Sequence, residues 1–512
     1  MTTIAEALRS SAHRRPDHLA YAYDKLEHSW AEVDRRVDRL ANALCAIGIG
    51  KGDVIASCCH DGPVLNEVLF AAARIGAIRV GLNYRYSAKE FAQVVQHCGA
   101  KLVFLQRDFA ALAADLPKHV RTVDAGDAQS DMAAYEALLQ SGAATPPDAQ
   151  VAENDVAQIC YTTGSTGEPK AAVWTHRNYM HSTCHTLLDL GMERNDTWLH
   201  CLPGAGVPCV LDTWNAVLGF TNVIMKAFEP KSCLTLIQKY KVTRTVWVPT
   251  MLLGVCTVAE QSKFDLSSVR RISYGSAPTT TALIRRALRT FAGVKFDQWY
   301  GSTEGAGGWY TQLTPEDHDR ALAGAEHLLQ SCGKPMHHAE IKIVRADGSI
   351  CPPGEVGEVC VRGQFVMKEY FRNPDLTAET LRGGWLHTGD MGKLDDEGYV
   401  FLVDRKQFMI ITGGYNVYPV DVENALAAHP AVAEVCVFGV PDEKWGEAVH
   451  ALVVLRPGQS ATQDEIVKWC RKDLAAFKVP KSIEFRDALM RGPTGKVLKR
   501  AHKEEYWKHA ER

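Results

Sequence analysis

The sequence lacks several features that would assign it to a specialised class of protein. Its formal net charge is only −3 over 512 residues, and no basic run is present, so nothing predicts attraction to nucleic acid or to an anionic membrane. No apolar run reaches membrane-spanning length. The N-terminus lacks the apolar core of a signal peptide, and the C-terminus carries no prenylation or peroxisomal address. We therefore expect a cytoplasmic protein without an integral membrane segment.

Paired cysteine motifs are also missing. The 15 cysteines are scattered, several lie inside apolar segments, and no CxxC pair occurs. Cys58 and Cys59 are adjacent, a spacing poorly suited to a structural bridge or a zinc knuckle. The pattern favours reduced, buried thiols over a disulfide framework.

What is present is ordinary globular composition, with 46% apolar and 23% charged residues. The length predicts two or more packed units. In the first part of the chain, short apolar segments alternate with segments of helical periodicity. This alternation is typical of a parallel sheet covered by helices on both faces. The predicted helices span residues 30–47 and 64–76, and the predicted strands span 53–58, 102–105, 222–226, 244–249 and 270–275. Residues 124–155 have weak periodicity and predict a surface excursion.

The pattern of apolar and turn residues changes in the last third of the chain. Short strands at 340–344, 357–361 and 399–403 lie between Gly and Pro turns and predict a small antiparallel barrel or sheet. A mixed α+β unit of about one hundred residues follows. Its predicted elements span residues 422–428, 435–439, 449–455 and 465–475.

The most informative segment is a glycine-rich stretch, YTTGSTGEPK, at residues 161–170. Gly164 and Gly167 allow backbone N–H groups to approach an anion, and the hydroxyls around them and Lys170 add donors and positive charge. This chemistry suits a polyphosphate. The segment is not a Walker A loop, because Pro169 stands where that pattern needs glycine. Taken alone, it is equally well interpreted as an ordinary surface loop.

The segment resembles the phosphate loop of the adenylate-forming superfamily, which includes acyl-CoA synthetases, adenylation domains of peptide synthetases and firefly-type luciferases. The usual form is YTSGTTGxPKG, from which this chain departs at Thr163, Ser165 and Ala171. The resemblance implies that Thr163 is catalytic and a magnesium ligand. It also implies ATP contacts from Thr162, Thr163, Gly164, Ser165, Thr166, Gly167 and Lys170.

A second motif, YGSTE at residues 300–304, resembles the family's YGxTE. The resemblance implies that Tyr300 stacks on adenine, that Thr303 donates to the α-phosphate and that Glu304 is catalytic and holds Mg²⁺, a cation that prefers carboxylate oxygens. Alone, the motif is a polar turn. GSAP at residues 275–278 resembles the family's strand-end segment beside adenine. The nucleotide contacts implied by these two motifs are Gly275, Ser276, Ala277, Pro278, Gln298, Trp299, Tyr300, Gly301, Ser302 and Thr303.

Three further motifs follow in family order. WLHTGD at 385–390 resembles W-x-x-TGD, which implies that Asp390 binds the ribose hydroxyls, although a type I turn explains the motif as well. Residues 404–419 resemble the family's interdomain linker, which implies that Arg405 contacts the ribose. Gln407 stands at the hinge, where relatives usually carry Asp or Lys. PTGK at 493–496 resembles PxxGK, which makes Lys496 the adenylation lysine.

The resemblance also implies coenzyme A contacts. Gly413 and Gly414 would line the channel for the pantetheine arm. Trp445, Phe477 and Lys481 stand where relatives contact coenzyme A, although a simple core role explains the two aromatics equally well. The predicted domains are an N-terminal AMP-binding domain at 1–403, a hinge at 404–408 and a small mobile C-terminal α+β domain at 409–512.

The acyl pocket is the least defined part of the prediction. Relatives often carry an aromatic–histidine pair where this chain has Gly204 and Ala205. Small and aromatic walls favour an apolar acid. Asp212 is interpreted as an exposed acid at a helix N-terminus, with an amine-binding role as the alternative. The predicted walls are Gly204, Ala205, Cys209, Trp247, Thr250, Gly275, Gly301, Gly305 and Trp309.

Together these motifs predict an α/β acyl-CoA synthetase. The resemblance implies that it uses ATP and Mg²⁺ to convert a fatty, cyclic or aromatic acid to an acyl-adenylate, and then passes the acyl group to coenzyme A. The alternatives are adenylation for a carrier protein, luciferase-type oxygenation and a catalytically inactive nucleotide or acyl sensor. The small-molecule partners are the acid, ATP and coenzyme A, and a homodimer stays open.

Overall fold

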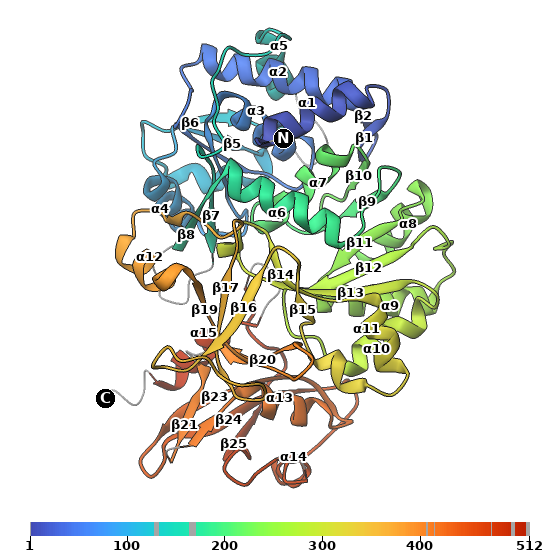
Figure 1. Ribbon diagram of the computed structural model, residues 1–512, viewed down its shortest axis with the longest axis vertical. Coiled ribbons are helices and arrows are strands. Elements are labelled where there is room, and N and C mark those ends of the chain that lie inside the picture. Colours follow the sequence, from blue (N-terminus) through green and yellow to red (C-terminus); the bar gives the residue numbers. More distant parts are fainter. Residues whose placement is uncertain are drawn as a thin grey trace. The chain divides into compact units, whose positions relative to one another are not determined.

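The computed structural model describes residues 2–126, 133–162, 170–405, 408–413, 415–472, 474–492 and 497–507 (Figure 1). The chain divides into two compact units. The first comprises Met1–Glu340 and Val361–Leu386, and the second comprises Ile341–Cys360 and His387–Arg512. The domain boundaries at residues 403 and 408 stay predictions. None of the helices in the described ranges has the length and apolar character needed to cross a membrane.

In the described part of the first unit, one sheet has nine strands. Its centre is parallel from β1 to β13, and β2, β14 and β15 pair antiparallel at its two edges. In spatial order the strands are β15 (Lys334–Pro335), β14 (Trp309–Leu313), β13 (Lys295–Gly301), β12 (Arg271–Gly275), β11 (Arg244–Trp247), β9 (Thr197–His200), β10 (Thr221–Ile224), β1 (Leu19–Tyr23) and β2 (Leu26–Ser29).

A second sheet of the first unit has seven strands in the described ranges. Its central strands are parallel, and β3 is buried along its whole length, as expected for a parallel strand covered on both faces. β8 and β18 pair antiparallel at one edge. In spatial order the strands are β18 (Glu369–Tyr370), β8 (Lys170–Thr175), β7 (Val156–Thr162), β4 (Ile78–Gly81), β3 (Val54–Cys58), β5 (Leu102–Leu105) and β6 (Arg121–Asp124).

Helices cover these two sheets. The predicted helices at 30–47 and 64–76 are confirmed as α2 and α3, which pack together (Figure 1). A capping box between Ser29 and Glu32 starts α2, since each residue bonds the other's backbone N–H. The helices are α1 (Ile4–Arg14), α2 (Trp30–Ala46), α3 (Pro63–Ile75), α4 (Ala88–Cys98), α5 (Ala133–Ser141), α6 (His176–Asp189), α7 (Val210–Leu218), α8 (Pro230–Tyr240), α9 (Pro249–Gln261), α10 (Thr281–Thr290), α11 (Pro315–Leu322) and α12 (Pro374–Thr380). The shorter 3₁₀ helices are η1 (Arg107–Asp115), η2 (Val207–Cys209), η3 (Thr303–Gly305), η4 (Glu326–Gln330) and η5 (Arg382–Gly384).

The stretch predicted as a surface excursion contains one helix that the periodicity missed. α5 packs on α2, and it buries only Tyr135 and Leu139. The Tyr135 hydroxyl donates to Glu67 at 2.7 Å, so the helix is anchored by a polar contact as well as by apolar burial. Two buried side chains are too few to give a clear helical period.

The second unit contains two sheets in its described residues. The predicted small barrel or sheet is a four-stranded sheet, and the predicted α+β unit has a five-stranded sheet with a helical cover. The strands are β16 (Glu340–Val344), β17 (Gly357–Arg362), β19 (Leu386–Leu394) and β20 (Val400–Arg405), followed by β21 (Ile410–Thr412), β22 (Tyr415–Val417), β23 (Val432–Asp442), β24 (Gly446–Leu455) and β25 (Ser482–Phe485). The helices are α13 (Pro419–Ala427), α14 (Gln463–Cys470) and α15 (Lys499–Trp507), so the element predicted at 465–475 is a helix that ends at Cys470.

Candidate active site

The predicted phosphate loop is flanked by the antiparallel hairpin of β7 and β8. Thr162 ends β7 and lies opposite Lys170, the first residue of β8, and its hydroxyl donates to the Lys170 carbonyl at 3.4 Å. The loop thus leaves the sheet at the carboxyl end of the parallel strand β7, the edge where ligands bind in such sheets. Five predicted loop contacts lie outside the described residues, namely Thr163, Gly164, Ser165, Thr166 and Gly167.

The segment predicted to border adenine begins where β12 ends. Gly275 pairs with Trp299 of β13, and a Cβ on Gly275 would lie 2.3 Å from the Trp299 carbonyl oxygen, so only glycine fits there. Ser276 follows with φ 68°, a left-handed conformation that is uncommon for a non-glycine residue. Ser276 and Pro278 are exposed and Ala277 is half-buried. The close pairing of β12 and β13 brings this segment beside the YGSTE motif.

Tyr300 and its neighbours lie at the carboxyl end of β13. Tyr300 is 9% exposed, and its ring meets Tyr310 edge-on at 5.4 Å. Gln298 donates to the Cys332 sulfur at 3.8 Å. A Cβ on Gly301 would lie 2.6 Å from the Gly308 carbonyl oxygen, and one on Gly305 would lie 2.6 Å from the Tyr310 ring. The two glycines therefore permit the tight turn that carries Thr303 and Glu304.

The carboxylate of Glu304 is held by two hydroxyl groups. Ser302 donates to one oxygen at 2.5 Å, and Tyr370 donates to the other at 2.6 Å. Burial and the adjacent Glu304 charge raise the pKa of Tyr370, so its hydroxyl keeps its proton. Each carboxylate oxygen has a second acceptor direction, so the arrangement fits a hard cation such as Mg²⁺.

Two further contacts connect Glu304 to the loop-flanking hairpin. Tyr370 lies in β18 and pairs with Ala172 of β8. The indole N–H of Trp174, also in β8, donates to the Thr303 carbonyl at 2.9 Å. The structure thus brings the YGSTE motif next to β7 and β8, as the predicted site requires.

Part of the predicted acyl pocket is fixed by buried charges. The backbone N–H of Gly204 donates to Asp61 at 2.6 Å, and its carbonyl accepts from Arg79 at 3.0 Å. A Cβ on Gly204 would lie 2.9 Å from the Asp61 carboxylate, and one on Gly81 would lie 1.9 Å from the Ala205 carbonyl oxygen. A larger side chain at Gly204 would therefore collide with the Asp61 carboxylate, and the Ala205 carbonyl fills the space where a side chain at Gly81 would lie.

The interpretation of Asp212 as an exposed acid is wrong. Asp212 is 4% exposed, and its carboxylate lies 3.2 Å from His200 Nδ1 and accepts from Asn222 at 3.0 Å. Burial lowers the pKa of His200, but the Asp212 charge outweighs this effect and raises it to about 9. Burial also raises the pKa of Asp61 to about 7. Asp212 belongs to a helix whose first turn is buried. Its charge is therefore balanced by His200 and not solvated by water.

The remaining predicted pocket walls lie in different surroundings. Trp309 contacts the buried Trp299 at 5.2 Å between ring centroids, whereas the buried Trp247 contacts Phe291 at 5.7 Å. The Cys209 sulfur accepts from Gln158 at 3.2 Å. Thr250 is exposed on the first turn of α9. Trp309 and Cys209 thus lie against the same buried core, while Trp247 packs elsewhere.

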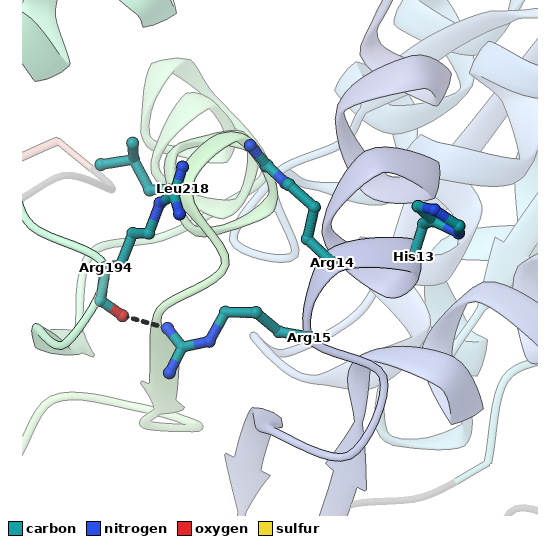
Figure 2. A pocket seen from close by; sticks show the side chains of 5 residues that line it. All are labelled: His13, Arg14, Arg15, Arg194 and Leu218. Atoms are coloured by element: carbon teal, nitrogen blue, oxygen red, sulfur yellow. Dashed lines mark hydrogen bonds between the residues drawn. The ribbon is translucent and has the colours of Figure 1, made fainter.

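A separate cavity of about 340 Å³ contains none of the predicted site residues (Figure 2). It is lined by His13, Arg14, Arg15, Arg194 and Leu218. Arg14 and Arg15 donate to the backbone carbonyls of Val217 at 2.7 Å and Gly219 at 2.9 Å. These guanidinium groups tie the end of α1 to the end of α7, and the cavity is not assigned to the candidate active site.

The remaining predicted nucleotide ligands belong to the second unit. Asp390 in β19 is 8% exposed and lies opposite Arg405 of β20 in the strand register. Gly389, just before it, has φ 72°, and the Thr388 hydroxyl accepts from the Asp390 backbone N–H at 3.1 Å. This turn within β19 orients the Asp390 segment, and the register brings the two predicted ribose ligands onto neighbouring strands.

The predicted coenzyme A residues in the second unit make two separate described contacts. The Gly413 N–H donates to the Trp445 carbonyl at 2.8 Å, and a Cβ on Gly413 would lie 2.7 Å from the Trp445 ring. Phe477 stacks on Tyr415 at 4.8 Å, and Tyr415 is 59% exposed. Lys481 is exposed. Gly414, Gln407 and Lys496 lie outside the described residues.

Four side chains that contact predicted site residues were not identified from the sequence. Asp61 and Arg79 are charged residues in or beside predicted buried elements, and a buried charge that needs a partner was the available signal. Tyr415 stands next to the predicted Gly413–Gly414 pair. Tyr370 had no signal, because only the antiparallel pairing of β18 with β8 brings it to Glu304.

The sequence matches the family described as AMP-binding enzyme over residues 8–371. It also matches the AMP-binding enzyme C-terminal domain over residues 421–496. The chain therefore belongs to the AMP-binding enzyme family, the adenylate-forming superfamily that its motifs predicted.

Two curated relatives cover nearly the whole chain. A feruloyl-CoA synthase of Amycolatopsis is 36% identical over 476 residues, 92% of each chain. A fatty acid–[acyl-carrier-protein] ligase of Streptomyces coeruleorubidus is 34% identical and covers 99% of this chain and 97% of the relative.

Among solved structures, the fold is similar to that of o-succinylbenzoate CoA synthetase from Bacillus subtilis. In complex with its acyl-adenylate intermediate, that enzyme has a TM-score of 0.86 and 30% identity, with 97% of each chain covered. In complex with ATP and magnesium ion, it has a TM-score of 0.85 and 29% identity, with 97% of this chain and 99% of that chain covered. The family and these relatives confirm the predicted fold class, the acyl-CoA synthetase branch and the class of an ATP-dependent acid–thiol ligase.

Proposed function

We propose that this enzyme activates an apolar carboxylic acid, either fatty, cyclic or aromatic, and transfers it to coenzyme A. In the first step the acid's carboxylate oxygen attacks the α-phosphorus of ATP, and the bond to the β-phosphate breaks, giving acyl-adenylate and pyrophosphate. In the second step the thiol of coenzyme A attacks the acyl carbonyl, loses its proton and releases AMP. The observation that carries the proposal is the contact of the Glu304 segment with the hairpin that flanks the phosphate loop.

Two anions meet in the first step, so positioning and charge neutralisation dominate catalysis. Glu304 and Thr163 are the proposed Mg²⁺ ligands, and the bound ion would neutralise phosphate charge. Ser302 and Tyr370 fix the Glu304 carboxylate by hydrogen bonds before substrate arrives. Tyr300 would hold adenine, and Lys496 would neutralise the reacting oxygens.

Residues of the second unit have proposed roles in binding both the nucleotide and coenzyme A. Asp390 and Arg405 would hold the ribose, and their pairing across β19 and β20 supports this proposal. Gly413 would leave room beside Trp445 for the pantetheine arm. Phe477, stacked on the exposed Tyr415, would provide an aromatic surface for the coenzyme A adenine. Lys481 would meet a coenzyme A phosphate.

The buried residues around the predicted pocket support an apolar acid. Trp309 and Trp299 supply aromatic surface, and Cys209 supplies a small side chain against the same core. Asp212 is already paired with His200 and Asn222, so it is not available to bind a substrate amine. This disfavours the alternative that the enzyme activates amino acids.

A second candidate acceptor is the thiol of a carrier protein. The Streptomyces coeruleorubidus relative, which acts with an acyl-carrier protein, is as similar over the whole chain as relatives that act with coenzyme A. The exposed Trp445 and Tyr415 are compatible with either thiol, because both present a pantetheine arm to the surface.

A cytoplasmic location and a homodimer stay proposals. Buried free thiols such as Cys58, Cys233 and Cys256 suit a reducing compartment. Cell fractionation tests the location. Light scattering after gel filtration tests the dimer.

The proposed function is tested with purified enzyme, ATP, Mg²⁺, coenzyme A and a mixed library of fatty, aryl, alicyclic and amino acids. We expect mass spectrometry to find thioesters of apolar acids and AMP in equal amounts. Lys496→Ala should lose acid-dependent ATP–pyrophosphate exchange but still form thioester from supplied acyl-adenylate. A strong preference for amino acids would overturn the substrate class, and no thioester from any acid would favour the sensor. Thioester only with added carrier protein would favour the second acceptor.

A further inference from the structure

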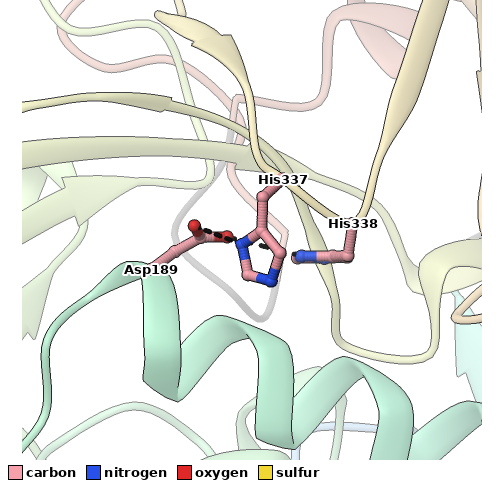
Figure 3. A group of neighbouring side chains, drawn as sticks. All are labelled: Asp189, His337 and His338. Atoms are coloured by element: carbon pink, nitrogen blue, oxygen red, sulfur yellow. Dashed lines mark hydrogen bonds and ion pairs between the residues drawn. The ribbon is translucent and has the colours of Figure 1, made fainter.

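One face of α6 carries three potential metal ligands that the proposed reaction does not use. His181, His185 and Asp189 are four residues apart, so they project from the same side of the helix. His337 and His338, in the turn between β15 and β16, approach the end of this helix. Figure 3 shows Asp189 at the last turn of α6 facing both histidines. All five residues belong to the first unit.

The ligand atoms of this group lie close together. His337 Nδ1 is 2.5 Å from one Asp189 oxygen, and His338 Nδ1 is 3.4 Å from the other. One ligand atom from each of Asp189, His337 and His338 lies within 4.8 Å of the other two. Ligand atoms in a tetrahedral zinc site are about 3.4 Å apart, because each lies about 2.0–2.1 Å from the ion. The group therefore needs only small shifts to surround one ion.

Several polar atoms here lack the partners that burial normally requires. The side chain of His338 is only 1% exposed, and neither of its ring nitrogens makes a hydrogen bond in the described structure. The Asp189 oxygen facing His338 also makes none. Buried polar groups are nearly always satisfied, so this cluster calls for an additional partner between Asp189 and His338.

We propose that Asp189, His337 and His338 bind one Zn²⁺ ion, with water as the fourth ligand. Two nitrogen ligands and one carboxylate favour a transition-metal ion over Mg²⁺ or Ca²⁺, which prefer oxygen alone. His185 is a positioning residue, because its Nδ1 lies 2.9 Å from the far nitrogen of His337 and fixes that ring's orientation. The site is separate from the predicted Mg²⁺ ligand Glu304 and does not depend on the proposed function.

The ion would act as a clip between two elements of the first unit. α6 directly follows β8 of the seven-stranded sheet, and the His337–His338 turn directly follows β15, the edge strand of the nine-stranded sheet. A ligand that binds the folded protein and not the unfolded chain raises its stability by mass action. Zinc binding should therefore raise the melting temperature.

The test measures zinc directly in chelator-treated full-length enzyme. We expect one Zn²⁺ per chain by competition with a chromophoric chelator and by elemental analysis after dialysis. His337→Ala and Asp189→Asn should each weaken binding by at least about 10-fold, since even loss of an outer partner costs about 10–100-fold. His185→Ala should give a smaller loss. Zinc should raise the melting temperature of the unaltered enzyme by a few degrees, but not that of His337→Ala.

His119→Ala is the matched control, because His119 is an exposed histidine of the same unit outside the cluster. It should bind zinc like the unaltered enzyme. His337 is exposed, so its replacement should leave the fold intact, which circular dichroism without metal checks. The proposal is overturned if no stoichiometric zinc is retained, or if the cluster variants retain it as well as His119→Ala does.

Discussion

The candidate adenylation residues of the first unit and the candidate coenzyme A residues of the second unit differ in exposure. In the first unit, the Glu304 carboxylate is fixed by two hydroxyl groups and Tyr300 is 9% exposed. In the second unit, Trp445 is 41% exposed and Tyr415 is 59% exposed. Charge stabilisation works best with groups fixed in advance in a dry site, whereas a long thiol arm needs an accessible surface. The contrast matches the two proposed half-reactions.

Glycine has a different role in each unit. A Cβ on Gly275 would meet a backbone carbonyl in the paired strand, so that glycine is required by the sheet itself. A Cβ on Gly413 would meet the ring of a half-exposed tryptophan, which has room to move. The first glycine is therefore part of the fold, and the second is a candidate for function.

The largest expected effect comes from Glu304→Gln. It keeps the shape of the side chain but removes the charge proposed to hold Mg²⁺. We expect acid-dependent ATP–pyrophosphate exchange to fall by about 10²–10³-fold, as for loss of one group that stabilises developing charge. Thioester formation from supplied acyl-adenylate should change much less. Initial-rate assays of the two half-reactions, run separately, measure both rates.

Glu316→Gln is the control for this variant, because Glu316 is an exposed glutamate in the same unit. It should leave both half-reactions unchanged. If Glu304→Gln slowed both half-reactions equally, the assignment of Glu304 to the first step alone would fail.

The sequence predicted the elements well where apolar periodicity was strong. α2, α3 and β5 lie within about one residue of their predicted ranges, because their apolar residues are packed continuously. The motifs also selected Glu304 and Asp390 as candidate ligands, and the structure places Glu304 in the short turn after β13 and Asp390 within β19. Periodicity failed at α5, where only two side chains are buried.

The side chains that hold the site could not be predicted in the same way. The contact between Tyr370 and Glu304 joins residues 66 positions apart and depends on an edge strand of two residues. Asp212 was misread because nothing local indicates that His200, at the end of another element, lies beside it. Tertiary partners of buried charges are set by sheet order, which a motif does not contain.

Gly413→Ala tests the open surface of the second unit. The added methyl group would lie 2.7 Å from the Trp445 ring at a position with φ 56°, so the ring or the backbone must move. We expect the KM for coenzyme A to rise by about 10-fold, since small misplacements are costly in a positioned reaction. ATP–pyrophosphate exchange should stay unchanged.

The matched control is Gly458→Ala, because Gly458 has φ 74° but nothing within 4 Å of an added Cβ. It separates backbone strain from collision with Trp445. Equal effects of the two variants on coenzyme A kinetics would remove the special role of Gly413.

The smallest expected effect is a pH dependence of stability that differs between the units. In the first unit Asp212 raises the pKa of His200 to about 9, although burial alone would lower it. In the second unit burial lowers the pKa of His450. His200 therefore contributes stability that is full below about pH 6.5, the ordinary histidine value, and is lost as the pH rises through about 9. His450 acts in the opposite sense, and its contribution is lost as the pH falls below the ordinary value.

Raising the pH from 7 to 9 should thus loosen the region around β9 and α7 more than the region around β24. Hydrogen exchange of peptides from the two units measures this directly, and the melting temperature should fall by a few degrees. The double variant His200→Asn with Asp212→Asn replaces the ion pair by neutral groups of similar size, and it should remove the alkaline loss in the first unit. The result that contradicts this prediction is an equal increase of hydrogen exchange in both units, or an unchanged alkaline loss of stability in the double variant. Either result would show that the His200–Asp212 pair does not cause the alkaline loss of stability.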